Sequence, residues 1–343
     1  MFDDYIALDV ETASGTPSIC SIGIVHVING KVEERYYRLI NPQKDFDYGT
    51  IAVHGITPDM VRDAPVFSQV WEEIRHFFVG NIVVAHNATF DLSQLAYSLQ
   101  EAGIFIPAFY YLDTVTLARK ALPGMDSYSL GKISYQLALP SFDHHNALAD
   151  AEASQTLLER VKRIMPLHLH QLRRYSIYRE SRSLKLEEFL SALRLRELLS
   201  SFQTGSFLSD SEKLTLEKEI SKISSENHLA LKEFAHLTEE ILAEGYVFSS
   251  LHPRLELLWN AFFPSSGHKG FFQSLQVFAE YQDSSEMSLS HLQPWIDYHT
   301  VLHEDPLLYP FFSHLQEDPF SSTSLDTLDR KSTRLNSSHI TIS

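Results

Sequence analysis

Residues 5–14 read YIALDVETAS and join a run of strand-forming apolar residues to two acidic side chains. The apolar run predicts a β-strand, and Asp9 and Glu11 stand where that strand ends. Side chains two positions apart point to the same face of a strand, so both carboxylates are expected on one face. Functional sites gather at the strand ends of α/β sheets, so this stretch indicates both a fold class and a candidate site.

The segments that follow predict a sheet with an antiparallel start. Residues 18–28, SICSIGIVHVI, are rich in strand formers. Asn29-Gly30 then stands between two strand-like runs, which is a strong signal for a two-residue hairpin. Residues 40–60 are expected to form a long loop. Residues 81–86, NIVVAH, predict a short and fully apolar strand.

Helical patterns alternate with these strands. Apolar residues recur at helical spacing, or helix-forming runs follow a strand end, in residues 66–78, 90–103, 110–122, 129–139 and 146–164. The order of elements predicts an α/β domain over residues 1–165, in which helices cover a mixed sheet.

The composition changes after Pro166. Residues 166–328 contain long helical patterns and a late concentration of aromatic residues, which predicts a mostly α-helical C-terminal module with its own core. No motif indicates the function of this module. Basic and aromatic residues in the segment 168–185 either follow a nucleic-acid strand or form the solvated face of a linker helix.

The final segment, residues 329–343, reads DRKSTRLNSSHITIS and looks foreign to the rest of the chain. Its codons can be written as a string that resembles a sequencing-library adapter. We therefore predict a translated adapter artefact and a natural C-terminus that is missing, and we exclude this segment from the fold prediction. The alternative is a disordered polar tail.

Composition excludes several classes of protein. No apolar run reaches the ~18 residues of a transmembrane helix, and the N-terminus lacks the basic region and cleavage site of a secretory signal. The single cysteine, Cys20, excludes an internal disulfide framework and a cysteine-based metal site. These features predict a cytoplasmic protein that does not bind a membrane. The formal net charge of −16 argues against bulk attraction to nucleic acid, although bound divalent ions would supply local positive charge.

Two further acidic residues stand at the ends of predicted elements. Asp91 follows the strand at 81–86 and opens a helix, and Asp150 lies in the first turns of the helix at 146–164. Clustered carboxylates repel one another unless a cation joins them. Oxygen ligands suit Mg²⁺ or Mn²⁺, and two such ions ~4 Å apart can clamp the attacking and leaving oxygens of a phosphodiester. Taken singly, each residue also fits an ordinary structural role such as a helix cap.

Three short motifs connect these residues to a known family. DVETA (9–13), HNATFD (86–91) and HNALADAEA (145–153) resemble the exonuclease motifs of the DnaQ-like 3′→5′ exonucleases, in the DEDDh subgroup. The N-terminal part of the chain is similar to the exonuclease domains of the polymerase III epsilon subunit and of RNase T. The resemblance implies a ribonuclease H-like fold. It also implies hydrolysis of terminal phosphodiester bonds of DNA or RNA, with release of nucleoside 5′-monophosphates.

The resemblance also implies roles for individual residues. The four carboxylates named above would hold two divalent cations, Mg²⁺ or Mn²⁺. His145, rather than the adjacent His144, would be the general base for the attacking water. Substrate contacts are implied for Thr12, His54 and Phe90. The expected partners are single-stranded 3′ ends of DNA or RNA, and the C-terminal module is a candidate site for a protein partner.

Alternative functions use the same features differently. A catalytically silent module that binds nucleic acid or protein would require the loss of a ligand or of the base, and all five residues are present. An RNA-directed enzyme similar to oligoribonuclease or RNase T keeps the chemistry and changes the substrate. A phosphatase of the haloacid dehalogenase type requires a second aspartate two residues after the first, where this chain has Glu11.

Overall fold

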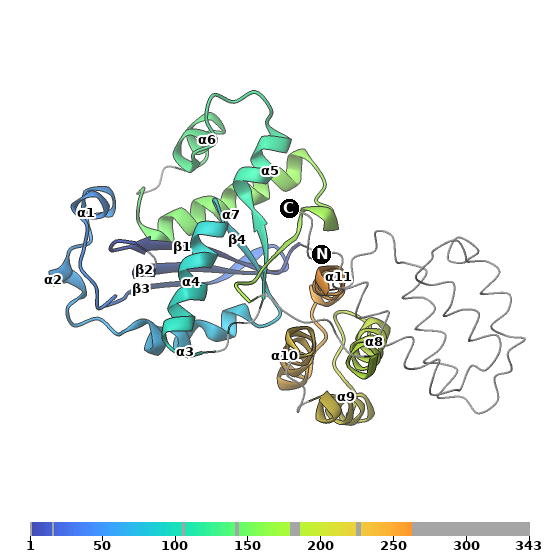
Figure 1. Cartoon of the computed structure of the whole chain (residues 1–343). Coiled ribbons are helices and arrows are strands. Elements are labelled where there is room, and N and C mark those ends of the chain that lie inside the picture. Colours follow the sequence, from blue (N-terminus) through green and yellow to red (C-terminus); the bar gives the residue numbers. More distant parts are fainter. Residues whose placement is uncertain are drawn as a thin grey trace, which may run out of the picture. The chain divides into compact units, whose positions relative to one another are not determined.

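In the computed structural model of the chain, a mixed sheet of six strands has the order β3-β2-β1-β4-β5-β6 (Figure 1). β1 pairs antiparallel with β2 and parallel with β4, and β2 pairs antiparallel with β3. β5 pairs parallel with β4 and antiparallel with β6. The antiparallel start predicted from the sequence is confirmed. The strands are β1 (Tyr5–Thr12), β2 (Ile19–Ile28), β3 (Lys31–Leu39), β4 (Ile82–Ala85), β5 (Phe109–Asp113) and β6 (Arg173–Tyr175).

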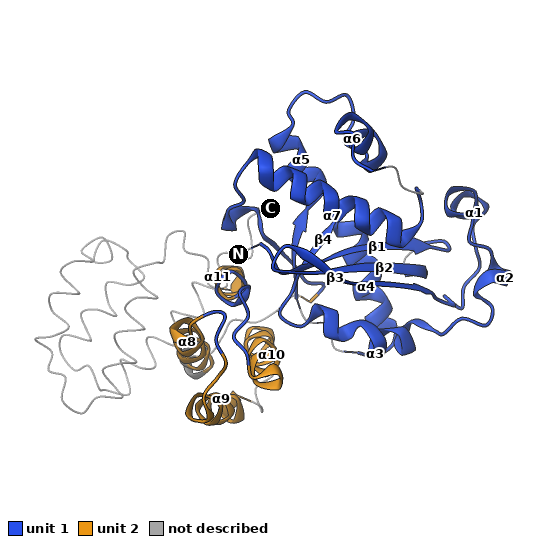
Figure 2. Ribbon diagram, turned by 180° about the vertical axis from the view of Figure 1, so that it is seen from behind, with its two compact units in different colours: residues 1–177, 204–206, 246–254 blue, residues 178–203, 207–245, 255–343 orange. Residues whose placement is uncertain are grey.

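The chain forms two compact units, shown in blue and orange in Figure 2. The first contains Met1–Ile177, Thr204–Ser206 and Tyr246–Arg254, and the second contains the rest of the chain. The domain limits proposed from the sequence, at residues 165 and 328, stay predictions. The suspected adapter segment, residues 329–343, lies outside the described residues. The structure describes residues 2–15, 17–104, 106, 108–140, 144–178, 186–223 and 228–262.

Helices cover both faces of the sheet. Neighbouring residues of β3 mark these faces, because Arg35 pairs with Glu152 of α7 whereas the Tyr36 hydroxyl donates to Glu73 of α3. A mixed sheet flanked by helices is the ribonuclease H-like α/β arrangement expected from the sequence, and that prediction is confirmed. The helices are α3 (Phe67–Phe78), α4 (Thr89–Glu101), α5 (Thr114–Ala121), α6 (Leu130–Gln136) and α7 (Ala147–Ile164).

The hairpin between β2 and β3 forms at Asn29-Gly30, as predicted. Both residues have positive φ, 51° and 72°, which is the backbone conformation that a type I′ turn requires. Asparagine and glycine adopt this conformation at low cost. The turn therefore joins the two long strands without splaying them.

The prediction of one long loop over residues 40–60 is wrong. This region contains α1 (Tyr48–His54) and α2 (Pro58–Val61). α1 buries none of its residues, so it has no apolar stripe for a sequence pattern to detect. It ends at Gly55, whose φ of 72° gives a left-handed C-cap. β6 was also missed, because three residues are too few to show an alternating pattern.

Gly23 allows the N-terminus of α7 to lie directly on the sheet. In β2 it pairs with Asp9 of β1, and a Cβ atom at this position would lie 2.3 Å from the backbone of Ala147. Only glycine permits such a close approach of two backbones. The approach brings the first turn of α7, which carries Asp150, beside the end of β1.

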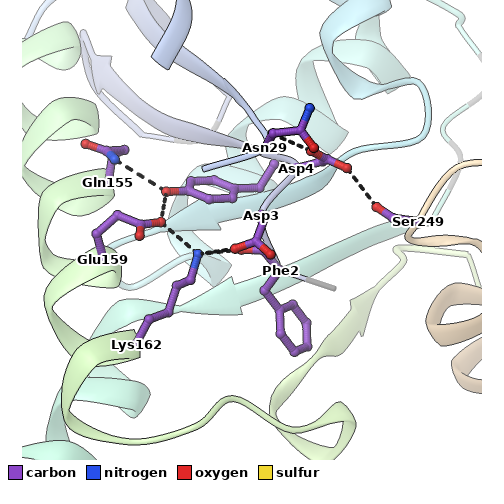
Figure 3. A network of polar contacts seen from close by, with 9 residues as sticks. Phe2, Asp3, Asp4, Asn29, Gln155, Glu159, Lys162 and Ser249 are labelled. Carbon is purple, nitrogen blue, oxygen red and sulfur yellow. Dashed lines mark hydrogen bonds and ion pairs between the residues drawn. The ribbon is translucent and has the colours of Figure 1, made fainter. Parts of the chain in front are cut away.

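The other end of α7 is joined to the start of β1 by a polar network (Figure 3). The Tyr5 hydroxyl donates to Glu159 at 2.8 Å, and Lys162 donates to Glu159 at 3.0 Å and to Asp3 at 2.8 Å. Burial, and then the Glu159 carboxylate, raises the pKa of the Tyr5 hydroxyl, so this group stays a neutral donor. Because both ends of α7 are held, the turn that carries Asp150 has a fixed support.

A stretch from the C-terminal half of the chain completes the first unit. Within Tyr246–Arg254, Ser249 donates to Asp4 at 3.0 Å (Figure 3) and Ser250 donates to the Gly80 carbonyl. Ser250 is only 1% exposed. These bonds show that the first unit is not built from the N-terminal residues alone.

The described part of the second unit is helical, as predicted. Trp259 packs edge-on against Phe234, and the Arg196 guanidinium lies 4.6 Å from the Trp259 ring centroid. Across the described ranges, no helix combines the length and apolar character needed to cross a membrane. The helices of this region are α8 (Leu186–Ser201), α9 (Asp210–Ile223), α10 (Leu229–Glu244) and α11 (Leu251–Phe262).

Candidate active site

The end of β1 supplies Asp9 and Glu11. β1 pairs regularly with β2 up to a bulge between Glu11 and Thr12, and Thr12, the last residue of the strand, pairs with Ile19. Both carboxylates line the same cavity, as expected for side chains two positions apart on one strand face.

Asp91 reaches the same place from the first turn of α4. Its side chain is 2% exposed, and its Oδ1 accepts the backbone N–H of Val10 at 3.1 Å. Val10 stands between Asp9 and Glu11 in β1, so this bond fixes the third carboxylate next to the first two.

Asp150 is positioned by the turn that begins α7. The Asn146 side chain caps the helix by accepting two backbone N–H groups of its first turn, each at 3.2 Å. His145 has φ of 65°, and its backbone N–H donates to Asp150 Oδ2 at 2.8 Å. Glu11, His145 and Asp150 each offer a potential ligand atom, and these three atoms lie within 4.8 Å of one another.

These side chains open into one cavity of about 550 Å³. β1, α4 and α7 contribute the carboxylates, and the start of α6 forms a further wall. The structure therefore brings together all five residues predicted for the chemistry. The lining residues are Asp9, Val10, Glu11, His86, Phe90, Asp91, Ser129, Leu130, Gly131, Lys132, His144, His145 and Asp150.

The four carboxylates have raised pKa values because they are withdrawn from water and repel one another. Desolvation, followed by the charges of the other three carboxylates, raises the pKa of Asp9 well above its ordinary value. Desolvation raises the pKa of Glu11 to about 8, with a smaller contribution from Asp150. It also raises the pKa values of Asp91 and Asp150. A divalent cation would neutralise this charge, so the oxygen-rich donor set fits a hard metal ion.

The raised pKa of Glu11 predicts how the stability of the metal-free protein depends on pH. Between the ordinary pKa of 4.5 and the folded value of about 8, the folded state binds more protons than the unfolded state. The melting temperature of the metal-free chain should therefore fall as the pH rises through this window. If Mg²⁺ binds the ionised cluster of the folded state, it should raise the melting temperature most at the upper end of this window.

Thermal unfolding in EDTA and in Mg²⁺ across this pH range measures both effects. Glu11→Gln should flatten the metal-free pH dependence, whereas Glu101→Gln, which alters an exposed carboxylate on α4, should not. The same pH slope in Glu11→Gln and in the unaltered chain would show that Glu11 titrates normally.

The three residues predicted to contact substrate do not all lie at the cavity. Phe90 is 44% exposed and lines the cavity. Thr12 and His54 are not among the described residues that line it. The Ile56 N–H donates to His54 Nδ1 at 3.0 Å, so Nε2 carries the proton and donates to the Thr12 carbonyl at 3.1 Å. His54 thus ties α1 to the end of β1, and a contact of either residue with substrate stays a prediction.

Two lining residues with ionisable side chains, His86 and Lys132, were not considered in the sequence analysis. His86 opens the motif HNATFD, which ends at Asp91, so its place in the same motif was a usable signal. Lys132 lies on the exposed side of a short helix and carries no such signal. The sequence did not assign His144 to the site. In the structure its Nδ1 lies 3.5 Å from Asp150 Oδ1.

Comparisons with known proteins identify the family that this part of the chain resembles. The RNase_T family model, described as an exonuclease family, matches residues 6–158. Residues 6–158 belong to the exonuclease family. The resemblance to DnaQ-like exonucleases expected from the motifs is confirmed for this exonuclease-family domain.

Individual relatives are similar to about half of the chain. The chain is 35% identical over 180 residues to the 3′-5′ exonuclease DinG of Bacillus subtilis (strain 168), which covers 50% of this chain and 19% of that protein. It is 32% identical over 159 residues to the PolC-type DNA polymerase III of Oceanobacillus iheyensis, which covers 46% of this chain and 11% of that protein. The chain thus spans about a fifth or less of the length of these curated relatives.

A solved structure, exonuclease X in complex with 5′ overhanging duplex DNA, is 28% identical to this chain. The match covers 49% of this chain and 96% of the other, with a TM-score of 0.41.

Proposed function

We propose that the chain is a metal-dependent 3′→5′ exonuclease. It would remove nucleotides from single-stranded 3′ ends of DNA or RNA and release nucleoside 5′-monophosphates. The observation that carries this proposal is the meeting of four carboxylates and one histidine, from three separate elements, in a single open cavity. The relative named as a 3′-5′ exonuclease, at 35% identity, supports the direction of hydrolysis.

The carboxylates of Asp9, Glu11, Asp91 and Asp150 would hold two divalent cations, Mg²⁺ or Mn²⁺. When bound, such ions polarise a phosphodiester and make water a stronger acid. The raised pKa values of the metal-free carboxylates support this role, because a cluster that resists ionisation alone gains most from a cation.

His145 would accept the proton of the attacking water. Its side chain is exposed at the edge of the cavity. One of its ring nitrogens lies within 4.8 Å of a carboxylate oxygen of Glu11 and of Asp150. Phe90 would stack on the terminal base, since its ring is partly exposed within the cavity. Base stacking tolerates any sequence, which suits an enzyme that removes successive nucleotides.

The test incubates the full chain and Mg²⁺ or Mn²⁺ with DNA and RNA strands of one sequence, each labelled at the 5′ or the 3′ end. A 5′ label should appear in a ladder of shortening products, and a 3′ label should be released at once as a mononucleotide. EDTA should stop both reactions. The ratio of the DNA and RNA rates measures the sugar preference.

Other outcomes would contradict the proposal. Release of a mononucleotide from the 5′ label would reverse the direction. Hydrolysis of p-nitrophenyl phosphate without strand shortening would favour a phosphatase. Strand binding without hydrolysis in either metal would make the chain a binding module.

A further inference from the structure

One wall of the acidic cavity carries a lysine that the chemistry above does not use. Among the described lining residues, Lys132 is the only lysine or arginine. It lies on α6 and is exposed, so its ammonium group stays hydrated and movable beside the carboxylates. A positive charge at this place would attract a polyanionic strand, which the chain as a whole, with a net charge of −16, repels.

α6 also presents an exposed aromatic ring. Leu130 and Ile133 are buried, whereas Tyr135 is 87% exposed. Residues three apart lie on the same side of a helix, so Lys132 and Tyr135 form one exposed face, with Lys132 at the cavity. Alternating cationic and aromatic side chains are the combination that binds single-stranded nucleic acid.

The first turn of α6 is held against the active site by two contacts. His86 Nε2 donates to the Tyr128 carbonyl at 2.9 Å, just before α6 begins. Burial lowers the pKa of His86, which favours the neutral ring, and the neutral ring can still donate through Nε2. Gly131 lies so close to His144 that a Cβ atom there would be 2.2 Å from its Nε2. The wall that carries Lys132 is therefore fixed to HNATFD and to the turn before α7.

We infer that Lys132 binds the phosphate on the 5′ side of the scissile bond and that Tyr135 stacks on a base further along the strand. This inference rests on the proposed exonuclease function and adds a path for the strand across α6. The scissile phosphate would be held by the carboxylate cluster and its cations, so the exposed ammonium is available to the next phosphate. The two α6 residues would make the enzyme prefer a strand to a single nucleotide ester.

Binding of a 5′-fluorescent oligothymidylate to the full chain in Ca²⁺ tests the inference, with strand integrity checked on a gel. Lys132→Gln should weaken binding about fivefold at low salt. The slope of log affinity against log salt should become shallower by about 0.7, as expected for one lost phosphate contact. Lys120→Gln, which alters an exposed lysine on α5 away from the cavity, is the matched control. Tyr135→Ala should weaken binding on the order of tenfold, and Tyr135→Phe should restore it.

Hydrolysis gives a second readout. The p-nitrophenyl ester of thymidine 5′-monophosphate contains one phosphodiester and no neighbouring phosphate. Lys132→Gln should lower the ratio of kcat/KM on DNA to kcat/KM on this ester, and Lys120→Gln should not. An equal loss on both substrates would place Lys132 at the reacting phosphate or in the fold, and would overturn the inference.

The two proposals fail in different ways. If the chain shortens DNA, but Lys132→Gln changes neither the binding affinity nor the salt slope, the strand path across α6 is overturned. The exonuclease proposal then still stands. A chain that binds the strand through Lys132 but hydrolyses neither substrate contradicts the exonuclease proposal alone.

Discussion

An Asp9→Asn chain should lose hydrolysis by on the order of 10³-fold in kcat while it keeps its fold. The amide has nearly the same size as the carboxylate but removes one negative charge from the cavity. Desolvation and three neighbouring carboxylates already raise the pKa of Asp9, so its ionised form depends on a bound cation, and the amide cannot supply that negative charge to the cation. Its loss should remove several kcal/mol of the stabilisation that bound metal gives to the transition state.

Stability distinguishes this loss from simple unfolding. Asp9→Asn removes the repulsion within the cluster, so the metal-free variant should melt at or above the temperature of the unaltered chain. The rise in melting temperature caused by Mg²⁺ should disappear. Asp59→Asn alters an exposed carboxylate on α2 that pairs with Arg62; this variant is the control and should keep activity and the Mg²⁺ effect. An Asp9→Asn chain with full kcat, or with an intact Mg²⁺ response, would show that Asp9 is not a metal ligand.

The main sheet and the carboxylates that line the cavity could be predicted because local sequence determines them. The strand at YIALDV is an apolar run that leads to two acidic residues, and Asn29-Gly30 has the two residues that accept positive φ. Asp91 follows a predicted strand, and Asp150 follows a helix cap. The order of the motifs was enough to assign both residues to one site. Each of these features can be recognised in a window of about ten residues, the scale on which periodic patterns are detectable.

The remaining features depend on contacts between distant residues. Nothing in SICSIGIV shows that Gly23 must accept the backbone of Ala147, because alternation predicts only which side of the strand a residue faces. The bond from His86 to the Tyr128 carbonyl spans 42 residues. The position of Lys132 follows from that bond, so a short amphipathic helix seen alone could not reveal it.

A His145→Gly chain should keep its fold and its metal affinity and lose about 10²–10⁴-fold in kcat, the contribution of a positioned general base. Glycine is the suitable replacement because His145 has φ of 65°, a conformation that glycine adopts freely and that costs other residues roughly 1–2 kcal/mol. The backbone N–H that binds Asp150 is then preserved. His145→Ala would combine the loss of the imidazole with backbone strain, and should also lower the melting temperature.

Free imidazole added to His145→Gly should restore part of the rate, because the glycine leaves room for the ring at the edge of the cavity. The matched variant is His144→Gly, since the His144 Nδ1 lies 3.5 Å from Asp150 and either neighbouring histidine could be placed near the water. His144→Gly should lose a much smaller factor, and imidazole should not change its rate. A larger loss in His144→Gly, with rescue by imidazole, would assign the base to His144. The motif that selects His145 by its spacing from Asp150 would then be a poor guide to which ring receives the proton.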